Sequence, residues 1–365
     1  MKNPWPFCLG LIAGSLLFAG RPASAQYTIT EVNACGDSTV DVGGLSRQDT
    51  IVGSCFVESG NPEFPLAITP FLIDRSGARE LPRVPGGLYV FPVGVNRRAE
   101  VIANRYYPGP TQAFVWHGSE PTALGTLGGE WSEAKGINNL GHIVGVAGLS
   151  DGTGHAFLYQ DGVMRDLGTF GADYSVASAI NDQLELVINR THGTNFDTCV
   201  PDCPLTRAAI YSRGKIVPLG SIGGRDTIGF GINSRGHVVG VSSFPAEESE
   251  EIIPSHVFYY HDGRIEDLHL LFPGLITTTS ANSINSRDEI VGSWSHYFDA
   301  ERVDGAFLFR DGTVVNLATL LPPGSEWSIK TGNFISDAGH IVGTGYHQGK
   351  YRWYLLTPTN GDHRH

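Results

Sequence analysis

The feature that most constrains this chain is an internal repeat. The segment 136–145, GINNLGHIVG, returns almost unchanged at 231–240 as GINSRGHVVG. Weaker copies bring the number of units to seven, and one position in each unit, here called the anchor, marks the repeat. The anchors are Ser46, Asn96, Asn138, Asn181, Asn233, Asn285 and Ser336. Successive anchors lie 50, 42, 43, 52, 52 and 51 residues apart, a spacing typical of repeat architectures.

Each unit is expected to hold four short strands in the same order. The first strand ends at the anchor, and an Asn-x-x-Gly turn leads into an Ile-Val-Gly strand, because Asn and Gly both tolerate positive φ. An aromatic third strand follows, such as HAFLY at 155–159, and the Asp-Gly pair at 161–162 predicts a hairpin into the fourth. Four strands in a repeat of this length indicate one blade of a β-propeller.

The two ends of the chain predict that the propeller closes. The last unit supplies three strands and finishes near 351–355, whereas 27–32 near the N-terminus forms a strand without the three that should precede it. If this strand completes the last blade, the chain is an all-β, seven-bladed propeller of four-stranded blades with few exposed edges. An open solenoid of the same units is the alternative. The 47 glycines and the absence of sustained helical periodicity agree with a strand-rich fold in either case.

Several of these motifs resemble a known family. The tripeptide His155-Ala156-Phe157, the segments DLGTFG at 166–171 and LGTLGG at 124–129, and the Gly-Ile-Asn turn are similar to those of the extracellular HAF-repeat proteins. The resemblance covers essentially the whole chain after residue 25. It implies an exported bacterial protein with a propeller-like fold. The family has no generally assigned activity, so the resemblance brings no catalytic residues.

The first 25 residues are typical of a secretory signal peptide. Lys2 supplies the positive charge, 8–20 is apolar, and 23–25 is an Ala-x-Ala cleavage site. The apolar run is too short for the alternative, a retained membrane anchor. We therefore expect a secreted or periplasmic protein without a membrane span, with one propeller domain over 26–358 and a short polar tail over 359–365.

Four cysteines remain after cleavage: Cys35, Cys55, Cys199 and Cys203. An even number in an exported chain predicts disulfides. Cys199 and Cys203 form a local pair, so that Cys35 and Cys55 are paired by elimination. The competing interpretation, a zinc half-site at 199–203, lacks a matching second half.

Charge and motifs exclude several function classes. The net charge of −12 argues against a nucleic-acid partner. No phosphate-binding glycine loop or nucleophile elbow is present, so we expect no cofactor and find no support for catalysis. Directly after the turn, four residues after the anchor, six units carry a histidine or a glutamate: Glu100, His142, Glu185, His237, Glu289 and His340. Equivalent positions in different blades lie far apart, so these are interpreted as solvated strand-edge residues and no metal site is predicted.

The candidate site lies on one face of the expected propeller. Loops between consecutive blades, and between the second and third strands, emerge on this long-loop face, and the longest span 189–206, 241–255 and 293–304. Seven residues before the anchors, at the expected mouth of the central opening, stand Tyr89, Trp131, Tyr174, Asp226 and Thr278, and Trp327 joins them if two residues are inserted before Ser336. The favoured interpretation is that these aromatics fill gaps between blades. The alternative is a glycan site, in which they stack on sugars while Arg225 and Asp226 bond hydroxyl groups.

The sequence thus favours a binding or interaction module for an extracellular glycan or a protein partner. A polysaccharide-active hydrolase or lyase with a funnel on the same face is the alternative. Paired carboxylates about 5 to 9 Å apart would favour a glycosidase. A purely structural surface protein is a third possibility, in which neither face carries a concave polar site.

Overall fold

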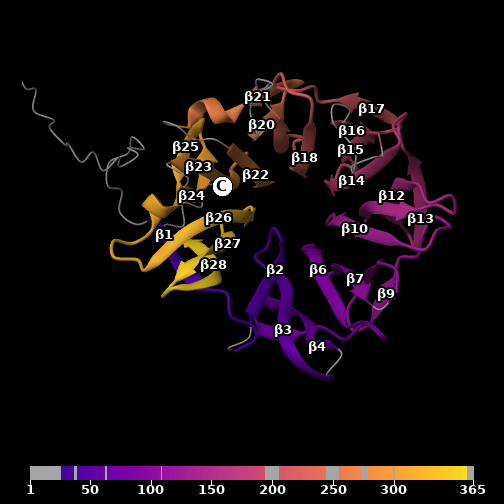
Figure 1. Ribbon diagram of the computed structural model, residues 1–365, viewed down its shortest axis with the longest axis horizontal. Coiled ribbons are helices and arrows are strands. Elements are labelled where there is room, and N and C mark those ends of the chain that lie inside the picture. The colour runs from indigo at the N-terminus through magenta and orange to yellow at the C-terminus, as the bar shows by residue number, and fades with distance from the viewer. Residues whose placement is uncertain are drawn as a thin grey trace, which may run out of the picture.

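The chain forms seven four-stranded antiparallel sheets arranged around a common axis (Figure 1). The computed structural model describes residues 26–36, 39–61, 64–107, 109–193, 205–243, 255–272, 276, 278–298 and 301–359. The predicted all-β, seven-bladed propeller is confirmed. The expected signal peptide, the Cys199–Cys203 pair and nearly all of the polar tail lie outside the described residues.

The blades follow one another along the chain. Blade 1 contains β2 (Thr39–Leu45), β3 (Ile51–Asn61), β4 (Phe64–Asp74) and β5 (Gly77–Glu80). Blade 2 contains β6 (Tyr89–Val95), β7 (Val101–Tyr107), β8 (Gln112–Trp116) and β9 (Pro121–Ala123). Blade 3 contains β10 (Ser132–Ile137), β11 (Ile143–Gly148), β12 (Gly154–Gln160) and β13 (Val163–Gly168). Blade 4 contains β14 (Tyr174–Ile180), β15 (Leu186–His192), β16 (Leu205–Ser212) and β17 (Lys215–Pro218).

The remaining blades include two short 3-10 helices. Blade 5 contains β18 (Thr227–Ile232), β19 (Val238–Ser243), β20 (Ser255–His261) and β21 (Arg264–Asp267), followed by η1 (Leu268–Leu271). Blade 6 contains β22 (Thr278–Ile284), β23 (Ile290–Phe298), β24 (Glu301–Arg310) and β25 (Thr313–Asn316), followed by η2 (Leu317–Leu320). Blade 7 contains β26 (Trp327–Ile335), β27 (Ile341–His347), β28 (Lys350–Pro358) and β1 (Tyr27–Glu31). The first strand of each blade lies nearest the axis (Figure 1).

The anchor asparagine builds the turn between the first two strands. In blade 3, Asn138 Oδ1 accepts hydrogen bonds from the backbone N–H groups of Leu140 and His142, at 3.0 and 2.9 Å. Gly141 closes this turn at φ +87°, a conformation that favours glycine. The repeated Asn-x-x-Gly motif is therefore explained by turn geometry.

The glycine of the Ile-Val-Gly strand is required by close packing. A Cβ atom at Gly145 would lie 1.9 Å from the Glu133 carbonyl oxygen and 2.9 Å from Phe157 Cε1. Gly145 pairs with Phe157 across β11 and β12, so the small residue makes room for the large one. Blade 4 reverses the sizes, because Ile188 pairs with Ala209. In both blades one small and one large residue face each other, so the combined volume of the pair is similar.

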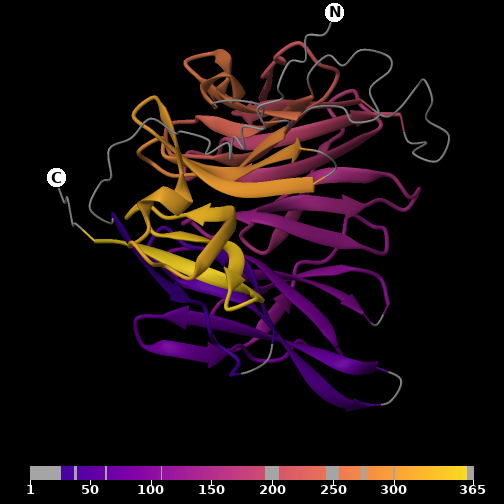
Figure 2. The same cartoon turned by 60° about the vertical axis from the view of Figure 1, so that its left-hand side comes forward.

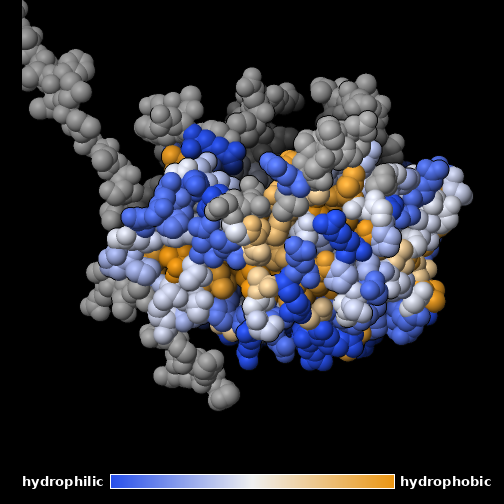
Figure 3. Space-filling view, turned by 90° about the horizontal axis from the view of Figure 1, so that it is seen from below, coloured by the Kyte–Doolittle hydropathy of each residue, from blue (hydrophilic) through white to orange (hydrophobic). Residues whose placement is uncertain are grey.

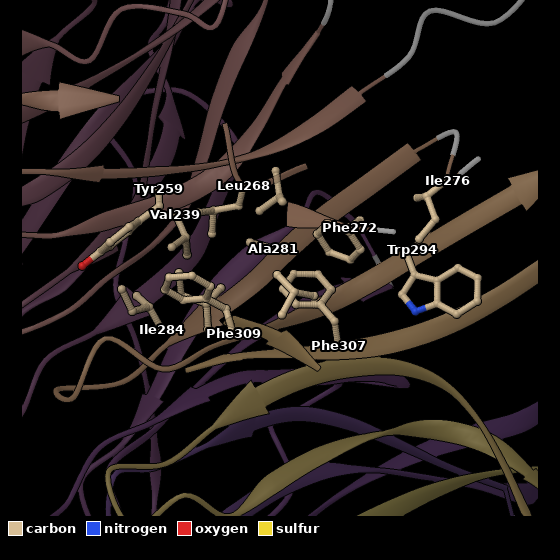
Figure 4. Packing of buried hydrophobic residues seen from close by; sticks show 13 residues of the cluster. Val239, Tyr259, Leu268, Phe272, Ile276, Ala281, Ile284, Trp294, Phe307 and Phe309 are labelled. Atoms are coloured by element: carbon tan, nitrogen blue, oxygen red, sulfur yellow. The ribbon is translucent and has the colours of Figure 1, made fainter. Parts of the chain in front are cut away.

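The hydrophobic core is divided among the junctions between blades. Each of the seven clusters of buried apolar residues combines side chains from two consecutive blades. Figure 4 shows the cluster between blades 5 and 6, where Phe307 and Phe309 of β24 lie among side chains of blade 5 such as Tyr259. Burial of each large apolar side chain contributes about 1.5–3 kcal/mol, so blade-to-blade packing holds the fold together.

The N-terminal strand closes the propeller, as predicted. β1 pairs with β28 from Tyr27 opposite Pro358 to Glu31 opposite Tyr354, and Figure 2 shows the two strands side by side. The Arg310 guanidinium of blade 6 donates a hydrogen bond to the Tyr27 hydroxyl at 2.9 Å. The predicted Cys35–Cys55 disulfide is present. The open-solenoid alternative is wrong.

One expected loop is a hairpin instead. β23 and β24 continue to pair as far as Phe298 opposite Glu301, so most of 293–304 is strand.

Figure 3 views the edge of the propeller and shows hydrophobic residues in its middle with hydrophilic residues around them. Among the described residues, no helix is long and apolar enough to cross a membrane.

Candidate binding site

The residues predicted to line the mouth occupy equivalent places on the long-loop face. Tyr89, Tyr174, Thr278 and Trp327 begin the first strands of their blades, and Trp131 and Asp226 directly precede theirs. β26 has two register shifts where β10 has one, which accounts for one inserted residue before Ser336 and not for the two that the alignment requires. Trp327 therefore lies one residue before the position equivalent to Trp131, and the role of these residues in ligand binding stays a prediction.

Trp131 and Tyr174 are half-buried because they cover glycines of blade 3. A Cβ atom at Gly148 would lie 2.6 Å from Trp131 Nε1, and one at Gly154 would lie 2.2 Å from Tyr174 Cε2. Burial, and then the negative charge of Glu133, raise the pKa of the Tyr174 hydroxyl to about 12. Much of the surface of these two aromatic side chains is therefore in contact with the rest of the propeller.

Trp327 and Tyr89 also contact aromatic residues of their own blades. The Trp327 side chain stacks on His347 with the ring centroids 4.6 Å apart and the planes within 5°. The Tyr89 and Tyr107 rings lie 5.8 Å apart. Both Trp327 and Tyr89 remain only partly exposed. Packing therefore takes up part of the surface of both side chains.

Asp226 and Thr278 are tied into the fold by hydrogen bonds. Asp226 Oδ1 accepts a hydrogen bond from the Thr206 N–H at 2.8 Å, and the Asp226 N–H donates to Ser243 Oγ at 2.9 Å. The hydroxyl groups of Thr278 and Ser295 are 2.5 Å apart. Arg225 is exposed beside Asp226. Of this polar pair, Arg225 is the more exposed residue.

A second set of aromatics lies ten residues after the anchors. This position is aromatic in three consecutive blades, at Tyr346 in blade 7, Phe56 in blade 1 and Tyr106 in blade 2. The corresponding residues of blades 3 to 6 are glycine or carry a hydroxyl group, namely Gly148, Thr191, Ser243 and Ser295. We call Tyr346, Phe56 and Tyr106 the aromatic arc. Counting ten residues from each anchor would have found it in the sequence.

The two tyrosines of the aromatic arc are open to solvent on the long-loop face, whereas Phe56 is partly buried. Tyr106 is 41% exposed and Tyr346 is 46% exposed, and Tyr351, beside Tyr346 with centroids 5.3 Å apart, is 51% exposed. These tyrosines lie where β7 and β27 end and β28 begins. Phe91 of β6 links the arc, with centroids 5.8 Å from Tyr106 and 6.3 Å from Phe56.

Charged groups lie beside the aromatic arc. Lys135 and Glu133 of β10 form an ion pair at 2.6 Å. Burial, with the nearby charge of Glu133, raises the pKa of the Tyr106 hydroxyl, while Lys135 opposes the shift. In blade 7, Lys330 Nζ lies 6.0 Å from the centroid of the Tyr346 ring. Exposed aromatic surface is thus combined with hydrogen-bond donors and acceptors, as in small-molecule sites.

The histidines and glutamates four residues after the anchors are not solvated strand-edge residues. Glu289 is 5% exposed and forms an ion pair with Arg310 at 2.5 Å. His237 Nδ1 lies 2.7 Å from an Asp288 carboxylate oxygen, and so joins blade 5 to blade 6. The others are Glu100, His142, Glu185 and His340, each with a polar partner. Within the described ranges, no group of three or more His, Cys, Asp or Glu side chains could hold a metal ion.

The histidine of the His-Ala-Phe motif pairs with the fourth strand. His155 Nδ1 lies 2.9 Å from Asp166 Oδ1 in blade 3. His256 repeats the contact with Asp267 at 2.8 Å in blade 5, and His269 stacks on His256 at 3.7 Å. Burial and the charge of His256 lower the pKa of His269 to about 4. Cross-strand His–Asp pairing therefore explains the motif structurally.

Comparison with known proteins shows a likeness in fold. A family model described as "Protein of unknown function (DUF3466)" matches residues 221–352. No curated protein matches the chain. The β-propeller domain of the trilobed protease from Pyrococcus furiosus superposes with a TM-score of 0.56 at 9% identity, over 89% of this chain and 96% of that domain.

Two enzymes are similar at the same level. The acylaminoacyl peptidase of Pyrococcus horikoshii has a TM-score of 0.52 at 10% identity, over 88% of this chain and 52% of the peptidase, so the chain spans about half that enzyme's length. An ulvan lyase, a polysaccharide lyase, has a TM-score of 0.50 at 9% identity, over 90% of this chain and 96% of the lyase. At these identities the likeness establishes the propeller fold alone.

Proposed function

We propose that this protein is an exported binding module that holds an extracellular saccharide on its long-loop face. The observation that carries the proposal is the aromatic arc. Three consecutive blades place an aromatic side chain at the position where the other four have glycine or a hydroxyl group, and its two tyrosines are each more than 40% exposed. Exposed aromatic surface that is confined to one region of a face typically marks an interaction site.

The chemistry of the arc suits a sugar better than a fully apolar ligand. A tyrosine offers a flat apolar ring and a hydroxyl group that donates and accepts hydrogen bonds. The Glu133–Lys135 pair and Lys330 add charged partners for ligand hydroxyl groups. The aromatics at the start of the first strands, including Trp131 and Trp327, would extend the same surface.

Export is supported by the sequence and by the disulfide. The segment 1–25 has the composition of a signal peptide, and the Cys35–Cys55 bond is of a kind found mainly outside the cytosol. Membership of the HAF-repeat family is supported by the motif residues, among them the His155–Asp166 pair. The location would bring the long-loop face into contact with polysaccharides of the cell surface or the surroundings.

Binding of the chain from Gln26 onward to a panel of neutral and anionic polysaccharides tests the proposal. Tyr106→Ala and Tyr346→Ala should each weaken binding at least tenfold, as substitutions at interface hot spots do. Leu140→Ala is the matched control, because Leu140 is 49% exposed but lies in a turn on the opposite face. Trp131→Ala and Trp327→Ala test the expected mouth residues in the same assay.

The outcomes separate the possible functions. Binding lost only in the long-loop-face variants supports the saccharide module. Release of new reducing ends or unsaturated products would instead identify a hydrolase or lyase. Absence of binding to every polysaccharide would overturn the proposal in favour of a protein partner, and equal loss in Leu140→Ala would refute the assignment to this face.

A further inference from the structure

A chain of side-chain amides ties six of the seven blades together. The anchor asparagines of blades 2 to 6 each donate a hydrogen bond from Nδ2 to the anchor carbonyl oxygen of the next blade, at 3.0–3.1 Å. The donors are Asn96, Asn138, Asn181, Asn233 and Asn285. The last acceptor is Ser336 of blade 7. Blades 2 to 7 are thus joined by five successive buried hydrogen bonds.

Blade 1 stands outside this chain. The anchors of the two junctions that flank it are Ser336 and Ser46, whose side chains carry no amide donor. Ser46 Oγ accepts from the Thr50 N–H at 3.0 Å, and Ser336 Oγ accepts from the His340 N–H at 3.2 Å, so both hydroxyl groups serve their own turns. Serine therefore preserves the turn but lacks the amide bond to the anchor carbonyl of the next blade, and the Ser336 side chain instead forms a hydrogen bond with Asp49 of blade 1.

The disulfide lies at one of these two junctions. Cys35 follows β1, which belongs to blade 7, and Cys55 lies on β3 of blade 1. Cys55 is 5% exposed and belongs to the apolar cluster between blades 7 and 1, together with Val42 and Phe71. The His340–Asp49 contact at 2.7 Å adds a polar bond at the same junction. A covalent bond is therefore found where the amide chain is interrupted.

We propose that blade 1 is the point at which the propeller opens, and that the Cys35–Cys55 disulfide is the lock that holds it closed. Reduction by a small dithiol would convert the disulfide into two thiols while the reagent becomes a cyclic disulfide. Blades 2 to 7 would keep their amide chain, so opening would be confined to β1 and blade 1. Local opening of this kind is measured by amide hydrogen exchange.

The lock also bears on the binding face, and this part rests on the proposed function. Phe56 directly follows Cys55, and the other two members of the aromatic arc, Tyr346 and Tyr106, lie on the blades at either side. Opening at blade 1 would separate the three aromatic side chains. Cys35 and Cys55 therefore act as positioning residues for the arc.

Hydrogen exchange of the oxidised and the reduced chain, followed by mass spectrometry without any ligand, tests the lock. In the reduced chain, exchange of β1, β2 and β3 should accelerate on the order of 10- to 100-fold, the range expected when a short disulfide loop is released. Exchange of β14 and β15 in blade 4 should not change. Equal acceleration in all blades, or none in blade 1, would overturn the proposal.

Two further variants test the amide chain independently of the disulfide. Ser336→Asn should restore an amide link toward blade 1 and slow the exchange of β2 in the reduced chain. Asn181→Ser should create a second interruption and accelerate exchange at the junction of blades 4 and 5. Failure of both variants to move exchange would refute the role of the amide chain.

The two proposals fail in different ways. Exchange needs no ligand, so an open blade 1 without polysaccharide binding would refute the saccharide proposal alone. Saccharide binding that survives reduction while blade 1 exchanges rapidly would refute the positioning role of the disulfide. Saccharide binding with no change in exchange would refute the lock.

Discussion

Asn138 allows the energetic weight of the amide chain to be worked out from the structure. It is 3% exposed. Its Oδ1 accepts from the Leu140 and His142 N–H groups, and its Nδ2 donates to the Asn181 carbonyl oxygen at 3.1 Å. A buried group that loses its partner costs about 1–3 kcal/mol. Asn138→Ala removes the acceptor of two part-buried N–H groups, and the Asn181 carbonyl oxygen keeps one partner, the Leu184 N–H at 3.3 Å, so we expect the free energy of unfolding to fall by about 2–4 kcal/mol.

The serine variant separates the turn from the link between blades. Ser46 and Ser336 show that a hydroxyl group can accept the turn N–H, so Asn138→Ser should lose chiefly the bond to Asn181, about 1–2 kcal/mol. Urea unfolding, followed by circular dichroism and tryptophan fluorescence, measures both variants, with Leu140→Ala as the control in the same turn. Equal losses for Asn138→Ala and Asn138→Ser, or a loss below about 1 kcal/mol for alanine, would refute the reasoning.

The remaining predictions concern packing and pH. Gly145→Ala should lower the melting temperature strongly, because the new Cβ would lie 1.9 Å from a backbone carbonyl oxygen; a neutral effect in calorimetry would contradict this. The pKa of Glu289 is lowered overall, because the hydrogen bond from Asn285 and the charge of Arg310 outweigh the effect of burial, which raises it. The ionised Glu289 carboxylate therefore stabilises the folded chain, and this contribution should be lost as the pH falls below about 4.5. Urea titrations at pH 3 and 7 should therefore show a smaller difference for Glu289→Gln than for the parent chain. Because the pKa of His269 is lowered in the folded chain, the unfolded chain takes up the proton at a higher pH than the folded chain does. The free energy of unfolding should therefore decrease as the pH is lowered from 6.5 to about 4, and His269→Phe should remove this pH dependence.

The fold could be predicted because the repeated residues have local reasons. Asparagine and glycine fix each turn, the Asp-Gly pairs fix the second hairpin, and the spacing of the anchors counts the blades. Closure followed from a strand at 27–32 that lacked partners. The prediction of a long loop at 293–304 was wrong, because the length of a segment does not distinguish a loop from a hairpin whose strands continue to pair.

The candidate site was less predictable because it depends on contacts between blades. The sequence placed Trp131 and Trp327 at the correct end of their blades, but the glycine beneath Trp131 and the His347 ring against Trp327 appear only in three dimensions. Glu289 looked like a solvated edge residue, since its partner Arg310 lies on another strand and well apart in the sequence. Side-chain burial that arises between distant segments leaves little periodic signal in one chain.

The residues that depart from the repeat carry the most information about this protein. Asparagine at an anchor and glycine in the second strand are explained by turn geometry and packing within the blade, so their presence distinguishes nothing about function. Because Ser46 and Ser336 replace asparagine, two amide hydrogen bonds between anchors are missing. The aromatic side chains ten residues after an anchor occur in blade 7, blade 1 and blade 2. Both departures concern the same part of the propeller, and the disulfide lies there too. The proposed binding face and the proposed opening point therefore rest on the same part of the propeller, where the scaffold and the exposed aromatics vary together, as in folds whose functional regions have lower local stability.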